Sequence, residues 1–146
     1  MYNDSRIEIY NYLYGLFYGT VTENVYSMNE PQELTESDTK DGFIVLHVGN
    51  IVDESEFDLS AFGSVRCFVE AFVPLISRGR LDVEKYQMFE QRITDVIKDA
   101  VANPSGDYYI QDDVILSMDD IETSNANNPY FTFVKSFIVN IEKDNS

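Results

Sequence analysis

The sequence predicts an α+β fold, in which two helices pack on one face of a four- to five-stranded mixed or antiparallel sheet. Two segments carry apolar residues at helical spacing, and several others alternate or run apolar over strand lengths. Two helices are too few to cover both faces of such a sheet, so the α+β class fits best. The expected order is helix, strand, strand, strand, helix, strand, strand, in one domain over residues 1–146.

The first helix is expected over residues 5–18. Ser5 and Glu8 have the spacing of a capping box at its start, and Gly19 is a typical stop at its end. The apolar stripe consists of Ile9, Tyr12, Leu13, Leu16 and Phe17. The other side carries Tyr10, Tyr14 and Tyr18 at four-residue steps. This tyrosine row indicates either a surface that a partner covers or one wide, half-buried stripe within the domain.

Three strands are expected next, over residues 24–28, 43–48 and 65–73. Polar, acidic links at 29–41 and 50–62 separate them, and long loops of this kind are usually functional or disordered. The run at 43–48 is continuously apolar, so it predicts a central strand that ends at Gly49. Residues 65–73 alternate between two faces of a strand. One face carries Val65, Cys67, Val69, Ala71 and Val73, and the other carries Arg66, Phe68, Glu70 and Phe72.

The second helix is expected over residues 83–101, after a turn that contains Arg78 and Arg80. Asp82 is the expected N-cap, because its carboxylate can accept a hydrogen bond from the first turn. The apolar stripe of this helix consists of Tyr86, Phe89, Ile93, Val96, Ile97 and Ala100. Its length and periodicity predict a helix that packs along the sheet.

Two strands are expected to close the chain, over residues 108–118 and 130–141. One face of the last strand carries Phe131, Phe133, Phe137, Val139 and Ile141. Lys135 interrupts that face. Because the helices cover one side of the sheet only, the other side is expected to be solvated or buried by another chain. Phe68, Phe72 and the run at 43–48 favour its partial burial.

The chain is strongly acidic, with a formal net charge of −16 from ten basic and 26 acidic residues. Binding to DNA phosphates requires neutralisation by Lys and Arg, so free nucleic acid is disfavoured as a partner. The charge fits three roles instead: the wall of a channel through which DNA slides, a mimic of DNA, or simple solubility. No run of 18 apolar residues occurs, so no membrane-spanning segment is expected.

Residues that carry most enzyme chemistry are scarce in this sequence. Cys67 and His47 are the only cysteine and histidine, both lie in apolar runs, and both are expected to be structural. Acidic groups at 53–58, and at 112–113 with 119–120, lack the EF-hand pattern and are expected to be solvated. No glycine-rich phosphate-binding motif occurs. The sequence therefore predicts no enzyme activity, no metal and no cofactor.

Arg78 and Arg80 form the one basic cluster in the sequence. They could pair with an acidic loop of a neighbouring copy, or else be solvated. The candidate oligomer interface combines these arginines with the tyrosine row and two phenylalanines: Tyr10, Tyr14, Tyr18, Phe68, Phe72, Arg78 and Arg80.

The order of elements resembles that of the tail terminator and tail completion proteins of tailed bacteriophages, and of related neck proteins. The resemblance covers nearly the whole chain and lies in its pattern. An N-terminal helix, a short strand and a long loop precede an apolar strand (FIVLHV) and an acidic loop. Then come a strand ending near a proline (VRCFVEAFVP), a helix (VEKYQMFEQRITDVIKDAV) and two closing strands. The resemblance implies a non-enzymatic subunit of a ring, commonly a hexamer with a dodecamer as the alternative.

The resemblance also implies partners and a location for this ring. It would assemble in the cytoplasm of a host bacterium and lie in the virion neck, between the portal-side connector and the tail. Adjacent neck, connector and tail proteins would contact the links at 29–41, 50–62 and 119–127, and DNA would be met only as it passes through the lumen, with no membrane contact. The alternative function is an acidic immunity or DNA-mimic inhibitor that binds a basic partner.

Overall fold

The computed structural model describes residues 2–28, 33–53, 62–104, 106–111, 116–119 and 130–142. The helices are α1 (Tyr2–Phe17), α2 (Glu36–Asp41) and α3 (Val83–Ala102), with a 3₁₀ turn, η1 (Ser77–Gly79), before α3. The strands are β1 (Val25–Ser27), β2 (Phe43–Asp53), β3 (Phe62–Pro74), β4 (Tyr108–Ile110), β5 (Leu116–Asp119) and β6 (Tyr130–Glu142).

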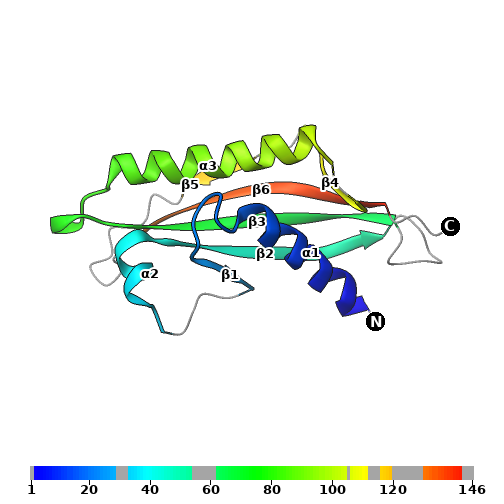
Figure 1. Ribbon diagram of the computed structural model, residues 1–146, viewed down its shortest axis with the longest axis horizontal. Helices are drawn as coiled ribbons and strands as arrows, with labels where there is room; N and C mark the ends of the chain where they lie inside the picture. The colour runs from blue at the N-terminus through cyan, green and yellow to red at the C-terminus, as the bar shows by residue number, and fades with distance from the viewer. Residues whose placement is uncertain are drawn as a thin grey trace.

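The described strands form one mixed sheet in the order β1-β2-β3-β6-β4, and β5 also pairs with β6. β1 is parallel to β2, whereas the remaining pairs are antiparallel. β3 and β6 are each 13 residues long and pair from end to end, so they set the long axis of the molecule in Figure 1. The predicted α+β class and mixed sheet are confirmed.

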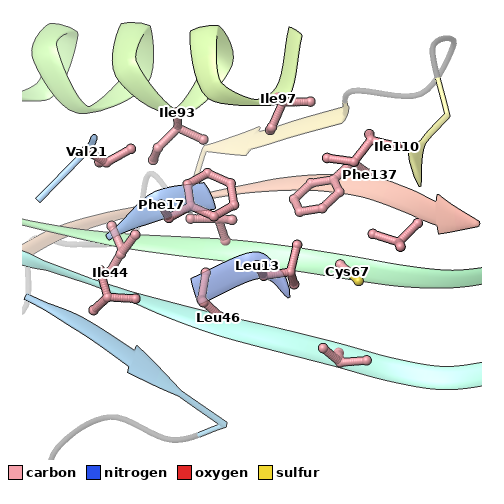
Figure 2. Close-up of a cluster of buried hydrophobic side chains, with 14 of the residues drawn as sticks. Leu13, Phe17, Val21, Ile44, Leu46, Cys67, Ile93, Ile97, Ile110 and Phe137 are labelled. Atoms are coloured by element: carbon pink, nitrogen blue, oxygen red, sulfur yellow. The ribbon is translucent and has the colours of Figure 1, made fainter. Parts of the chain in front are cut away.

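Helices α1 and α3 pack on the same face of this sheet, and the main core lies between them and the strands. Leu13 and Phe17 of α1 meet Ile93 and Ile97 of α3 over the side chains that β2, β3 and β6 direct toward them (Figure 2). All four are fully buried, and burial of each such side chain is worth about 1.5–3 kcal/mol. Because alternate strand residues point toward this helical layer, the residues between them point to the opposite face of the sheet.

The strand–turn–helix unit forms as its sequence predicts. The Val65, Cys67, Val69, Ala71 and Val73 face of β3 is buried beneath the helices. Asp82 caps α3, its Oδ1 accepting a hydrogen bond from the Lys85 backbone N–H at 3.1 Å. The stripe on α3 is buried at Phe89, Ile93, Ile97 and Ala100.

The start of α1 differs from the sequence prediction. The helix begins at Tyr2, so Ser5 lies inside it, and the predicted capping box with Glu8 is wrong. A capping box requires a residue outside the helix at its start, and residues 2–4 are already helical here. The predicted stop is confirmed, since Gly19 has φ 77°, a conformation that glycine adopts without strain.

Strand β2 does not end at Gly49, as the apolar run suggested. It continues to Asp53 through a β-bulge between Val48 and Ile51. Glycine is needed here because a Cβ at Gly49 would lie 2.9 Å from the backbone oxygen of Arg66 on β3. The predicted link at 50–62 is therefore shorter, and residues 54–61 lie outside the described part of the chain.

A short helix, α2, occupies the end of the segment that was predicted to be a loop at 29–41. Thr35 and Asp38 form a reciprocal capping box: the Thr35 hydroxyl accepts from the Asp38 N–H at 3.0 Å, and Asp38 Oδ2 accepts from the Thr35 N–H at 2.9 Å. The capping box stabilises a helix in a segment whose apolar residues have only weak helical periodicity. Residues 29–32 lie outside the described range.

The single strand expected over 108–118 is two short strands in the structure. β4 pairs with the end of β6, and β5 pairs with its first half. Residues 112–115 between them, and most of the link at 119–129, are not among those described. The last strand, β6, matches the prediction and extends one residue further, to Glu142.

Candidate assembly surface

The second face of the sheet is the one that points away from α1 and α3. Strand alternation and pairing register place its residues. It comprises Phe43, Val45 and His47 of β2; Arg66, Phe68, Glu70 and Phe72 of β3; and Tyr130, Thr132, Val134, Ser136, Ile138 and Asn140 of β6. We call this set of residues the second face.

One end of the second face is sealed by aromatic packing. Phe43 stacks on Phe72 with ring centroids 4.4 Å apart, and Tyr130 meets both rings edge-on. Tyr26 of β1 packs against the same cluster. Phe72 is only 5% exposed, so this predicted interface residue is already buried within the subunit.

Helix α2 closes this end through one fully buried carboxylate. Asp38 Oδ2 accepts a hydrogen bond from the Tyr26 hydroxyl at 2.6 Å. Burial, reinforced by the hydrogen bond to Asp38 and the charge of that carboxylate, raises the pKa of Tyr26 to about 12. Tyr26 therefore remains a neutral donor at physiological pH, and it ties α2 to the sheet.

The middle of the second face is only half-buried and carries polar pairs around apolar side chains. His47 Nε2 lies 3.1 Å from Glu70 Oε1. On the other side of Phe68, Arg66 Nη1 donates to Ser136 Oγ at 3.3 Å. Phe68, Val134 and Ile138 are part-exposed between and beside these pairs. Apolar side chains ringed by polar groups are typical of a surface that another protein covers.

Tyr10 does not lie on the outer side of α1. It is 8% exposed, and its hydroxyl accepts a hydrogen bond from the Val48 N–H at 3.1 Å. Arg6 Nη2 donates to the Val48 carbonyl at 2.7 Å. β1 pairs with β2 only as far as Leu46, so α1 supplies the partners that the edge of β2 lacks at Val48.

The other two residues of the tyrosine row are exposed. Tyr14 and Tyr18 are 41% and 45% exposed, and their rings stack with centroids 5.1 Å apart. The row is therefore divided: Tyr10 belongs to a buried stripe within the domain, whereas Tyr14 and Tyr18 form a solvent-facing aromatic pair on the helix side of the sheet.

Arg78 and Arg80 are exposed in the turn between β3 and α3. The turn is closed by a hydrogen bond from the Ile76 N–H to the Arg80 carbonyl, at 2.8 Å. Arg78 has φ 65°, a left-handed conformation that is unfavourable for a residue with a Cβ. Ile76 beside it is 44% exposed, so the turn presents both charge and apolar surface.

Six of the seven predicted interface residues thus occupy three places: Tyr14 and Tyr18 on the outer side of α1, Phe68 and Phe72 on the second face, and Arg78 and Arg80 in the turn before α3. Tyr10 is instead buried between α1 and β2. The His47–Glu70 pair and the Asp38 anchor were not predicted as parts of a surface. The pair was hidden because it depends on the register of β2 against β3, which places His47 opposite Phe68 and beside Glu70. For α2, the capping-box spacing of Thr35 and Asp38 is the sequence feature from which the helix could have been predicted.

Reactive groups are buried or paired where the structure describes them. Cys67 is fully buried, and this burial raises the pKa of its thiol to about 12, so it stays protonated at neutral pH. Among the described residues, no three His, Cys, Asp or Glu side chains gather as metal ligands would. The acidic groups at 53–58, 112–113 and 119–120 have no described side chains.

Within the described ranges, no helix has the length and hydropathy needed to cross a membrane. No protein-family model and no curated protein matches this sequence. The fold and surface are those of an α+β protein in which helices α1 and α3 cover one face of a mixed sheet. The described residues seal the opposite face at the end that holds the aromatic cluster and α2.

Proposed function

We propose that this chain is a structural subunit of a ring in the neck of a tailed bacteriophage, of the tail-terminator type. The ring joins the portal-side connector to the tail and surrounds the DNA channel. The observation that carries this proposal is the half-buried middle of the second face, where Phe68, Val134 and Ile138 remain part-exposed beside polar pairs. The element order that resembles this family also supports it.

Burial of this surface by a sister copy is energetically reasonable. Apolar area removed from water contributes about 25 cal/mol per Å², and a stable protein interface buries about 800 Å² on each partner. Polar pairs such as His47–Glu70 would fix the orientation of the contact more than its strength. A contact between unlike surfaces closes into a ring when its rotation returns to the start.

The net charge of −16 per copy fits a channel for DNA. A lumen lined with carboxylates repels phosphates, so DNA that passes through would remain mobile. A ring with many copies multiplies this charge, so its net electrostatic effect on DNA is repulsive.

Negative-stain electron microscopy of the purified chain, alone and with a tail-tube protein, tests the proposal. Ring-shaped particles with a central hole support it. The variant Phe68→Asp should abolish the rings, because it places a charge in the covered surface, whereas Ile7→Asp, at a 53% exposed residue of α1, should leave them intact. Particles without a hole under every condition would contradict it.

The alternative function is an acidic inhibitor that binds a basic partner, which the net charge favours. It predicts a monomer or dimer that blocks a nuclease stoichiometrically. The described solvent-facing side of α3 mixes Lys98 and Arg92 with Asp95 and Asp99, rather than presenting acids alone as a DNA mimic would. A ring therefore remains the proposal.

A further inference from the structure

The two ends of the molecule differ in charge. The segment Leu75–Leu81 forms the left-hand tip in Figure 1 and contains two arginines and no acidic residue. We call it the basic tip. At the opposite end lie the last turn of α3, the start of β4 and the end of β6, which carry Asp99, Asp107 and Glu142. We call these three residues the acidic end.

The basic tip is built as a projecting contact. Arg78 and Arg80 are exposed, with Ile76 (44% exposed) between the strand and the arginines. Asp82, the N-cap of α3, follows the tip in the sequence. Arg78 remains in a left-handed conformation, although glycine would relieve the strain. Charge beside exposed apolar side chains suits a protein partner, because a phosphate backbone would leave the apolar groups uncovered.

The partner with matching chemistry is a second copy of the chain. α3 separates the two ends, and its 20 residues span about 30 Å. The Debye length is only about 8 Å at physiological salt, so the tip of one copy gains little from its own acidic end. Between two copies, by contrast, the basic tip and the acidic end can approach within this distance and attract each other. The negative end of the α3 dipole adds to the acidic end.

We propose that the basic tip of each copy docks on the acidic end of the next, so that subunits join head to tail. This inference rests on the proposed ring, because a head-to-tail contact is the kind that closes into one. It names the two surfaces in contact and predicts that each subunit uses both at once.

A charge-swap experiment tests the contact. Arg78→Glu/Arg80→Glu should lose assembly, and so should Asp99→Lys/Glu142→Lys, because each variant meets like charge at one surface. An equimolar mixture should assemble again in alternating order, since each variant's altered surface then faces its opposite. Sedimentation velocity measures the species, and the thermal unfolding midpoint of each variant reports whether it remains folded. A loss of at least tenfold in subunit affinity is expected for each variant alone.

A control variant separates this contact from net charge. Gln87→Glu/Gln91→Glu adds two negative charges on the exposed side of α3, as many as the single variant Arg80→Glu adds at the tip. It should assemble like the wild type, whereas Arg80→Glu should weaken assembly. Folded arginine variants that still form wild-type rings would overturn the docking and leave the ring intact. A mixture that stays unassembled would also overturn it.

Three further outcomes bear on the docking and on the proposed ring. Open filaments of wild-type chain that the arginine variant abolishes would support the docking and overturn the closed ring. A wild-type monomer at every concentration would overturn both. Binding of a DNA duplex that is lost in the arginine variant, measured by fluorescence anisotropy, would assign the tip to nucleic acid instead and overturn the docking.

Discussion

At the scale of single residues, several polar side chains satisfy backbone groups that the sheet leaves without a partner. Tyr10 and Arg6 bind the N–H and carbonyl of Val48. Arg92 of α3 donates to the Val21 carbonyl at 3.1 Å in the same way. Such contacts depend on tertiary geometry, which explains why the four-residue spacing of the tyrosines did not reveal that Tyr10 is buried.

Arg78→Gly should stabilise the isolated subunit. The left-handed conformation costs a residue with a Cβ about 1 kcal/mol more than it costs glycine, and Arg78 has φ 65°. We expect the free energy of unfolding to rise by up to about 1 kcal/mol in urea titrations. Arg80→Gly is the matched control, because Arg80 has φ −84° and gains no such relief. A stability equal to wild type for Arg78→Gly would show that the turn is unstrained.

Cys67 should make the subunit less stable at alkaline pH. Burial raises the pKa of its thiol from 9.0 to about 12. Below pH 9 both states are protonated and the full stability is present; as pH rises toward 12, only the unfolded chain loses the proton, so stability falls. Between pH 8 and pH 10 we expect a loss of about 1 kcal/mol from this group.

Urea titrations at these two pH values measure the loss. Cys67→Ala is less stable at pH 8 because it removes buried volume, but its stability should depend less on pH. The comparison with Cys67→Ala isolates the thiol, because Tyr26, whose pKa is raised from 10.0 to about 12, also begins to lose its proton from the unfolded chain in this interval and does so in both proteins. Equal pH dependence in both proteins would contradict a buried, protonated thiol.

At the scale of elements, the strongest periodic segments were predictable and the short ones were not. The stripe and N-cap of α3 and the alternation of β3 and β6 are set by burial on one side, so sequence spacing alone locates them. α2 is six residues long and depends on one capping box, and the extension of β2 depends on a glycine bulge. Both depend on contacts with distant residues, Tyr26 and Arg66, that a local pattern does not contain.

Asp38→Ala should detach α2 from the sheet. The change removes the hydrogen bonds to the Thr35 N–H and the Tyr26 hydroxyl, and it leaves a part-buried hydroxyl without its acceptor. Loss of a cap and of a part-buried hydrogen bond to a charged group predicts a destabilisation of about 2–4 kcal/mol in chemical denaturation. Glu36→Ala, an exposed change in the same helix, should cost less than about 1 kcal/mol. Similar losses for both variants would argue against Asp38 as the anchor.

At the scale of the whole molecule, the described residues cover the two sides of the sheet unequally. α1 and α3 cover one face, while the aromatic cluster and α2 seal the second face at one end. The fold class and this asymmetry followed from counting two long helices against the strands. The division of the candidate interface into three places did not, because it depends on the register between strands and on which side of α1 meets the edge of β2.

Assembly should weaken with salt if the head-to-tail contact between the basic tip and the acidic end contributes to it. Exposed charge pairs are screened as ionic strength rises, whereas apolar contacts of the second face are not. We expect the midpoint concentration for assembly to rise between low salt and molar salt. Sedimentation velocity at the two ionic strengths measures this shift. An unchanged midpoint would show that charge pairs do not contribute to the contact between subunits.

The most direct measurement is the mass of the purified chain by light scattering during size-exclusion chromatography, over a wide range of concentration. A closed ring predicts one species whose mass is a fixed integer multiple of the 16.8 kDa subunit, unchanged as concentration rises. A chain that stays at 16.8 kDa at every concentration, and also in the presence of a tail-tube protein, would contradict completion of the sheet by sister copies.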